Sequence, residues 1–186
     1  MSDPVSALQG AEFQGFVTVR DCGVQGMITL RGDLADAGLA RAVKQLVGAP
    51  MPAQGMRSDG KHGAVLWMSP DELLILCGHA QAQVLADQMA AALAGQHALV
   101  ANVSDARAMF AVDGPLWRDV LRKLSPADVS QTAFAEGMVR RSRIAQVAGA
   151  FWHEGTGVRI ICFRSVAPYM MGLLTNAVAE GSALNL

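Results

Sequence analysis

Charged residues are scarce in this sequence, and neither sign of charge dominates. Asp, Glu, Lys and Arg make up 17% of the 186 residues, against roughly 25% in an average soluble domain. The 15 Lys and Arg residues nearly balance 16 Asp and Glu residues, so the net charge is -1. No strong field is therefore available to recruit nucleic acid or an anionic membrane. Hydrophobic residues make up 52% of the chain. This composition, together with the scarcity of charge, favours a surface that is partly covered by another protein.

Cysteines and long apolar runs are also few. The three cysteines are Cys22, Cys77 and Cys162; they are too scattered for a disulfide framework, and their odd number suits a reducing compartment. No stretch approaches the ~18 uninterrupted apolar residues of a membrane-spanning helix. Residues 1–10 also lack the basic and apolar regions of a secretory signal. We therefore expect a cytoplasmic protein.

Motifs of metal, nucleotide and nucleophile sites are missing from the sequence. No CxxC or HExxH is present, and no two histidines stand three or four residues apart. GxGxxG, GxxxxGK[ST] and GxSxG are absent as well. The chain consists of two similar halves, described below, and Cys77 and Cys162 fall at equivalent places in them. We therefore expect both to pack in the core as small hydrophobic residues. The sequence thus predicts no catalytic residue, no cofactor-binding residue and no metal ligand in this chain.

What the sequence does contain is a repeated order of elements. Residues 20–34 (RDCGVQGMITLRGDL) and 103–115 (VSDARAMFAVDGP) share an acidic turn, a strand-like run and a glycine before a helix. Gly32 and Gly114 are 82 positions apart. Each half is predicted to be a strand-strand-helix-strand-strand-helix unit, so the chain is interpreted as an internal duplication.

The predicted fold class is α+β, with antiparallel sheets and helices on one face. Residues 1–14 are expected to be a loose lead-in, 15–97 the first repeat half, and 98–186 the second. The two halves are expected to form one compact domain.

Apolar alternation predicts strands, and a 3.6-residue apolar period predicts helices. The expected strands cover 15–19, 26–31, 64–68, 73–77, 98–103, 108–112, 138–152 and 158–163. Four helices are expected. One follows a cap at Asp33, one covers 80–94, one begins at Gly114-Pro115, and one follows a cap at Ser165. Residues 49–63 are expected to be a turn-rich loop.

The one dense charge cluster is VRRSR at 139–143. Arg140, Arg141 and Arg143 could protect a sheet edge from wrong pairing. They could instead bind a partner's carboxylates or a phosphate. Both interpretations stay open from the sequence.

Arg107 and Trp152 complete the set of possible partner contacts. Two residues apart on a strand, Asp105 and Arg107 would share a face, which favours a local ion pair over a functional role. Trp152 suits the core, although tryptophan also anchors interfaces.

Three segments together resemble one known family. LWMSPDELLIL at 66–76, NVSDARAMFAVDGP at 102–115 and FRSVAPYMMGLL at 163–174, with ITLRGDL upstream, resemble the gamma subunit of heterotetrameric sarcosine oxidase over roughly residues 15–180. Their order and separation, more than any single motif, carry the resemblance. Leu73 departs from the aromatic residue expected after the PDE turn, a size change that does not threaten the fold.

The resemblance implies a fold like the folate-binding domain of the glycine-cleavage T-protein. It implies membership of a complex with alpha, beta and delta subunits that demethylates sarcosine to glycine, with hydrogen peroxide and formaldehyde or 5,10-methylenetetrahydrofolate as products. FAD, FMN, NAD and tetrahydrofolate would be held by the large subunits and zinc by delta. The gamma subunit would contribute no catalytic group and would support the alpha-beta assembly.

Two other functions keep the same fold. One is a free-standing folate-binding one-carbon transferase, although FAEGMVRR lacks the cysteine of the related iron-sulfur assembly proteins and an active T-protein is about twice this length. The other is a homo-oligomeric interaction module. A residual folate or anion pocket between the halves is left open by the sequence.

Overall fold

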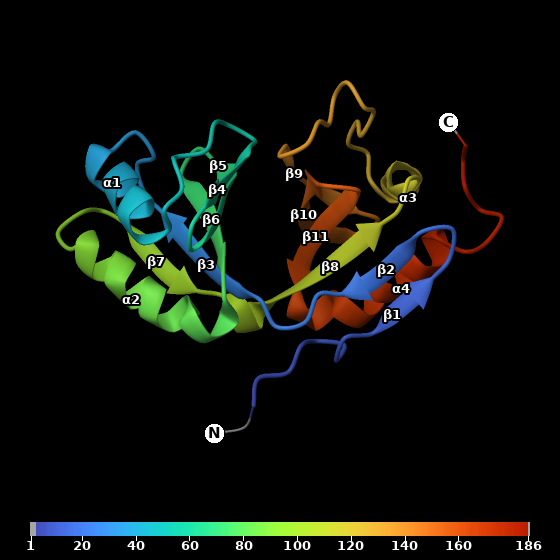
Figure 1. The fold of residues 1–186 in the computed structure, drawn as a ribbon, viewed down its shortest axis with the longest axis horizontal. Coiled ribbons are helices and arrows are strands. Elements are labelled where there is room, and N and C mark those ends of the chain that lie inside the picture. The colour runs from blue at the N-terminus through green and yellow to red at the C-terminus, as the bar shows by residue number, and fades with distance from the viewer. Residues whose placement is uncertain (1–2, 186) are drawn as a thin grey trace. The chain divides into compact units, whose positions relative to one another are not determined.

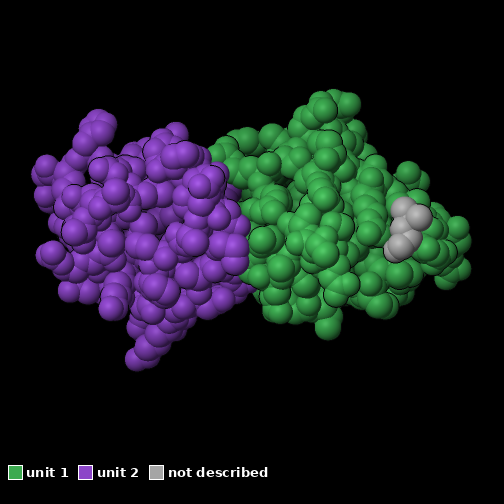
Figure 2. All heavy atoms as spheres, turned by 90° about the horizontal axis from the view of Figure 1, so that it is seen from above, with its two compact units in different colours: residues 1–24, 105–186 green, residues 25–104 purple. Residues whose placement is uncertain are grey.

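A computed structural model describes residues 3–185 and divides the chain into two compact units (Figures 1 and 2). Unit 2 is the continuous segment 25–104, whereas unit 1 combines the residues up to 24 with those from 105 onward. Every strand pair is antiparallel. Within each unit both helices pack on one face of the sheet. The predicted α+β fold class is confirmed.

Unit 2 is a five-stranded sheet of order β4-β5-β6-β3-β7. Its core lies between the sheet and the two helices, where Ile28, Leu39, Val43 and Met89 are fully buried. Its elements are β3 (Gly26–Arg31), α1 (Ala37–Leu46), β4 (Arg57–Gly60), β5 (Gly63–Ser69), β6 (Glu72–Cys77), η1 (His79–Gln81), α2 (Ala82–Ala92) and β7 (Leu99–Asn102).

Unit 1 is a six-stranded sheet of order β1-β2-β8-β11-β10-β9. Its core contains Phe110, Val120, Phe151 and Met170, all fully buried. Its elements are β1 (Glu12–Gln14), β2 (Thr18–Asp21), β8 (Arg107–Asp113), α3 (Trp117–Leu124), β9 (Val139–Ile144), β10 (Val147–Glu154), β11 (Gly157–Phe163), η3 (Arg164–Val166) and α4 (Ala167–Ala177), with η2 (Ser104–Ala106) at the boundary.

The two sheets have the same strand order once β1 is set aside, with β2, β8, β11, β10 and β9 matching β7, β3, β6, β5 and β4. The sequence halves and the compact units nevertheless differ by one strand. β2 opens the first half but pairs with β8, as in Val19↔Val112. β7 opens the second half but pairs with β3, as in Leu30↔Val100. Each unit is thus completed by a strand from the other half, while a duplication as its origin stays a prediction.

The segment before β2 is not a loose lead-in. The buried carboxylate of Asp21 accepts hydrogen bonds from Ser6 Oγ, Leu8 N and Gly10 N. Residues Glu12–Gln14 form β1 and pair with β2. The prediction for residues 3–14 was therefore wrong, because a buried carboxylate supplies local order that hydrophobic periodicity does not reveal; residues 1–2 lie outside the described part.

Three predictions about strands and loops also need correction. The loop expected at 49–63 contains β4, a polar edge strand without apolar alternation. The extended run expected at 138–152 is two strands, β9 and β10, joined by a tight turn at Ala145 with φ 50°. Each half therefore has one strand more than expected. The expected strand 15–19 is shifted to 18–21.

Helix starts differ from the sequence expectation by one short turn. The N-cap of α1 is Asp36, whose carboxylate accepts a hydrogen bond from Leu39 N at 2.8 Å; Asp33 lies before it and accepts from Ala35 N. Ser165 does not cap α4, because it belongs to the 3-10 turn η3 that leads into the helix. Pro168 stands in the first turn of α4, as expected.

Candidate functional site

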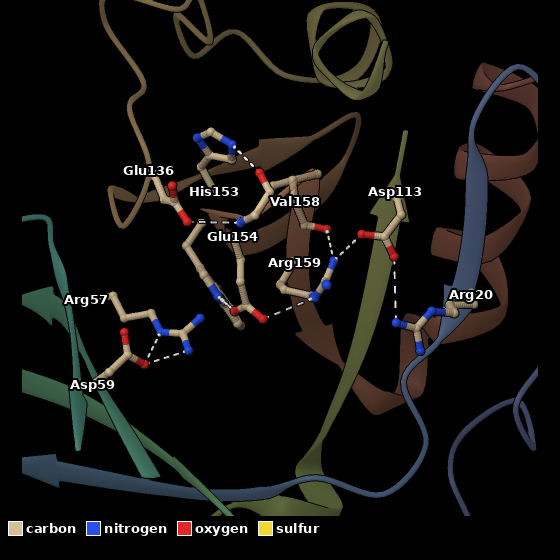
Figure 3. Close-up of polar contacts among 11 residues, drawn as sticks. Arg20, Arg57, Asp59, Asp113, Glu136, His153, Glu154, Val158 and Arg159 are labelled. Atoms are coloured by element: carbon tan, nitrogen blue, oxygen red, sulfur yellow. Dashed lines mark hydrogen bonds and ion pairs between the residues drawn. The ribbon is translucent and has the colours of Figure 1, made fainter. Parts of the chain in front are cut away.

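The main polar cluster of unit 1 centres on Asp113 at the end of β8. Arg20 of β2 and Arg159 of β11 both pair with Ala111, one from each side of β8, so their side chains emerge on the same face. Arg159 Nη1 lies 2.7 Å from Asp113 Oδ1, and Arg20 Nη2 lies 3.6 Å from Asp113 Oδ2 (Figure 3). One carboxylate therefore ties three adjacent strands together.

Glu154 and Trp152 extend this cluster along β10. Arg159 Nε lies 3.7 Å from Glu154 Oε1, and Trp152 Nε1 donates to Glu154 Oε2 at 2.9 Å. Because Trp152 is 1% exposed, its surface is taken up by contacts within the chain. We call Arg20, Asp113, Trp152, Glu154 and Arg159 the Arg159 cluster. Both of its carboxylates are paired with arginine, so the arrangement is suited to fixing strand ends and not to moving protons.

A second group of side chains organises residues 125–138, the irregular segment between α3 and β9. Arg118 donates to the carbonyl oxygens of Val129, Ser130 and Phe134, and its guanidinium lies 4.3 Å from the Trp117 ring centroid. Burial lowers the pKa of Arg118, and the nearby Arg122 charge lowers it further. Arginine stays charged even so, and the segment is held by charge-assisted hydrogen bonds.

The structure separates the three arginines predicted as partner contacts on 139–143. Arg140 is half-buried, donates to Ala133 O at 2.8 Å, and lies 5.5 Å from the Phe134 ring centroid. Arg141 and Arg143 are exposed on β9, the edge strand of the unit 1 sheet. The three arginines therefore all lie within the edge strand β9.

Arg107, the remaining predicted contact, begins β8 and is half-buried. Its guanidinium lies 5.6 Å from the ring centroid of Phe163, which is 56% exposed. Asp105 belongs to the 3-10 turn η2 and not to the strand. The expected shared strand face of Asp105 and Arg107 was therefore wrong.

The cysteines are buried or half-buried thiols. Cys77 lies in the unit 2 core and Cys162 in the unit 1 core, so the prediction of matched core positions is confirmed. Burial raises the pKa of Cys162 to about 11. Burial also raises the pKa of Cys77 and of Cys22, although the Arg20 charge opposes the rise at Cys22. These groups are protonated at neutral pH and are poor nucleophiles.

A groove of about 430 Å³ lies in unit 2 beside α1 and α2. Its lining combines the apolar side chains of Leu46, Val84 and Leu85 with glutamine side chains and His62. Sequence reasoning missed it because its walls come from separate helices. Among residues 3–185 no group of three potential metal ligands lies close together, and no helix there is long and apolar enough to cross a membrane.

Comparison with known proteins decides the family. Residues 31–180 match the model of the sarcosine oxidase, gamma subunit family. The chain belongs to this family. It is 30% identical over 184 residues to the sarcosine oxidase subunit gamma of Corynebacterium sp. (strain U-96), covering 96% of this chain and 88% of the relative. It is 31% identical to the corresponding subunit of Arthrobacter sp. over 143 residues, covering 76% of this chain and 69% of that one.

Solved structures agree with the family. Heterotetrameric sarcosine oxidase from Corynebacterium sp. U-96, in complex with pyrrole 2-carboxylate, contains a chain that matches with a TM-score of 0.82 and 28% identity, covering 94% of this chain and 91% of that chain. The glycine cleavage system aminomethyltransferase T from Bartonella henselae matches with a TM-score of 0.63 and 14% identity, covering 86% and 46%. The second likeness shows that this chain shares the T-protein fold, as the sequence resemblance implied.

Sequence reasoning found the family but missed the Arg159 cluster. Asp113 and Arg159 look like ordinary charged residues beside strands, and Arg20 lies far from both in the chain. The signal that could have revealed Asp113 and Arg159 was the pair of expected strands at 108–112 and 158–163, because charged residues on neighbouring antiparallel strands can share a face.

Proposed function

We propose that this chain is the non-catalytic gamma subunit of a heterotetrameric sarcosine oxidase and supports its alpha-beta assembly. The observation that carries the proposal is the match of residues 31–180 to the gamma-subunit family. The TM-score of 0.82 over 94% of the chain supports it. The partners would be the alpha, beta and delta subunits.

The whole complex would convert sarcosine, oxygen and water into glycine, formaldehyde and hydrogen peroxide. With tetrahydrofolate present, the one-carbon unit would leave as 5,10-methylenetetrahydrofolate. The other subunits would hold FAD, FMN, NAD and tetrahydrofolate. The complex would thus serve sarcosine catabolism and one-carbon metabolism. In the gamma chain, Asp113 and Glu154 are each paired with arginine, which supports a structural role for its most concentrated polar group.

Among the predicted contacts, the exposed positions Arg141 and Arg143 are the ones we propose to meet a partner. Both lie on an edge strand, where a carboxylate of another subunit could reach their guanidinium groups. The other predicted contacts would instead hold parts of this chain in place, since the side chains of Arg140, Arg107 and Trp152 are half-buried or buried within it.

We also propose a cytoplasmic location. Cys22, Cys77 and Cys162 are all free thiols, and a reducing compartment keeps cysteines in that state.

Co-purification tests the proposal. The tagged chain would be expressed with the alpha, beta and delta subunits encoded by the same genome and compared with the three subunits expressed without it. We expect a yellow complex of four chains that consumes oxygen when given sarcosine, and an alpha-beta assembly less resistant to heat when gamma is omitted. Equal assembly and equal heat resistance without gamma would refute the supporting role. A lone colourless chain that binds tetrahydrofolate would favour a free-standing folate protein instead.

A further inference from the structure

The four edge strands of the two sheets differ in charge. Edge strands expose unpaired backbone N–H and C=O groups, and proteins usually protect them with charged side chains. β1 carries Glu12, β9 carries Arg140, Arg141 and Arg143, and β4 carries Arg57 and Asp59. β7, with the sequence LVAN, carries no charged residue. It therefore lacks the charged side chains that the other three edges have.

The hydrogen bonding of β7 shows which of its backbone groups point outward. Val103 N donates to Met27 O of β3 at 2.8 Å. Because residues of an antiparallel strand alternate in direction, Ala101 and Leu99 also direct N–H and C=O toward β3. Val100 and Asn102 direct theirs away from it. The Leu99 side chain is 55% exposed beside this edge.

The matching edge of unit 1 is already occupied. Asp21 pairs with Phe110 of β8, and Asn102 pairs with Ile28 at the corresponding place of β3. In unit 1 the outward N–H of Asp21 donates to Ala11 O at 2.8 Å. Phe13 of β1 lies opposite Val19 in antiparallel register. This arrangement shows that the edge geometry common to both units accepts a short antiparallel strand.

The charges define what would fit on β7. In unit 1, Glu12 of the covering strand lies opposite Arg20. The residue that matches Arg20 in β7 is Ala101, which pairs with Thr29 of β3 as Arg20 pairs with Ala111 of β8. An acidic side chain would therefore find no counter-charge there. Beside Leu99 and Val100, an uncharged segment with a central apolar residue fits best.

We propose that the β7 edge receives an extended, uncharged segment of a partner subunit as an added antiparallel strand, with an apolar side chain opposite Val100. The inference rests on the proposed function, because it requires a partner subunit. Backbone hydrogen bonds would supply affinity, and the apolar pair would set the register.

Hydrogen exchange of single amides tests the strand directly. The full-length chain would be measured alone and within the co-purified complex. We expect exchange at Val100 and Asn102 to slow by at least ~10-fold on assembly, because these amides gain acceptors only in the complex. Leu99 and Ala101, bonded to β3 in both states, are the internal reference. Unchanged exchange at Val100 and Asn102 in an intact complex would overturn the proposal.

Substitutions give an independent test. Leu99→Lys places a charge at the edge, and Val84→Lys is its matched control, since Val84 is 59% exposed on α2. We expect Leu99→Lys to weaken assembly at least ~10-fold and Val84→Lys to leave it unchanged. Val100→Pro removes an outward donor without altering the bonds to β3, and should weaken assembly similarly. Equal assembly of Leu99→Lys and Val84→Lys would refute strand addition even if the proline variant fails to fold.

The failure of this inference and that of the proposed function give different results. If no complex forms with the sarcosine oxidase subunits, both fall. If the complex forms but tolerates Leu99→Lys, only the strand addition falls. Concentration-dependent protection of Val100 and Asn102 in the chain alone would identify a second copy as the occupant and would likewise overturn the partner-subunit proposal.

Discussion

Asp21 and Asn102 occupy the same structural position at the two places where the chain passes from one unit to the other. Asp21 ends β2 and accepts a hydrogen bond from Gly23 N at 3.2 Å. Asn102 ends β7 and accepts one from Ser104 N at 3.1 Å. Each side chain thus forms a short turn with the residue two positions later. The same kind of local hydrogen bond therefore forms just before each crossing.

Asp21→Ala is expected to destabilise the protein more than Asn102→Ala. Asp21 also accepts from Ser6, Leu8 and Gly10, so its loss would release the segment before β1. We expect a loss of about 2–3 kcal/mol in the free energy of unfolding for Asp21→Ala and about 1 kcal/mol for Asn102→Ala. Urea unfolding measures both, and limited proteolysis should cleave the released segment only in Asp21→Ala. Equal losses would contradict the anchoring role.

Arg159→Met tests the Arg159 cluster. The Arg159 side chain is 16% exposed and contacts both Asp113 and Glu154, so we expect a loss of about 1–3 kcal/mol in the free energy of unfolding. Arg31→Met is the matched control, because the Arg31–Asp71 pair is 2.8 Å long but its side chains are 49% and 57% exposed. The control should change stability by less than about 0.5 kcal/mol. Similar values for both variants would show that burial does not strengthen the cluster.

Ala145→Gly is expected to stabilise the protein. Ala145 adopts φ 50° in the turn between β9 and β10, a region where glycine has no steric cost. The gain should be about 0.5–1 kcal/mol, measured by chemical unfolding. Gly155→Ala is the reverse control, since Gly155 has φ 59° and an added Cβ would meet no other atom within 4 Å. This variant should lose a similar amount of free energy of unfolding. A destabilised Ala145→Gly would argue against strain at this turn.

The raised pKa of Cys162 predicts a loss of stability at alkaline pH. The thiol ionises near 9.0 when unfolded, whereas burial raises its pKa to about 11 in the folded chain. Between these values the unfolded state loses its proton first, so the free energy of unfolding falls as pH rises from 9 towards 11. The contribution is on the order of 2–3 kcal/mol, because each pKa unit corresponds to about 1.4 kcal/mol. Plotted against pH, the free energy of unfolding should fall more steeply for the wild type than for Cys162→Ala in this range only. Parallel curves would contradict the raised pKa.

The parts of the fold predicted correctly are those with strong hydrophobic periodicity. The hairpin formed by β5 and β6 and the central strand β3 follow directly from alternating apolar residues. β4 was missed because its sequence, RSDG, has no apolar side chain to signal a strand. Its ladder with β5, and not its own composition, makes it extended.

The polar contacts could not be predicted because they depend on which strands become neighbours. Asp113 meets Arg20 only because β2 crosses into the sheet of β8. Likewise, Arg140 was predicted as a surface group from its charge, but the Phe134 ring and the Ala133 carbonyl hold it against its own chain. Composition identifies such residues as charged, and only strand register shows what they contact.

The exchange of β2 and β7 also determines the order in which the sheets can be completed during synthesis. Unit 2 is continuous in sequence, so all of its strands have emerged from the ribosome soon after residue 104. β2 is made early but has no neighbour on its β8 side until residues 107–113 follow. The six-stranded sheet then waits for β11, which ends at Phe163. The earliest strands of the chain are therefore among the last to be enclosed, and a nascent chain must keep them from pairing elsewhere in the meantime.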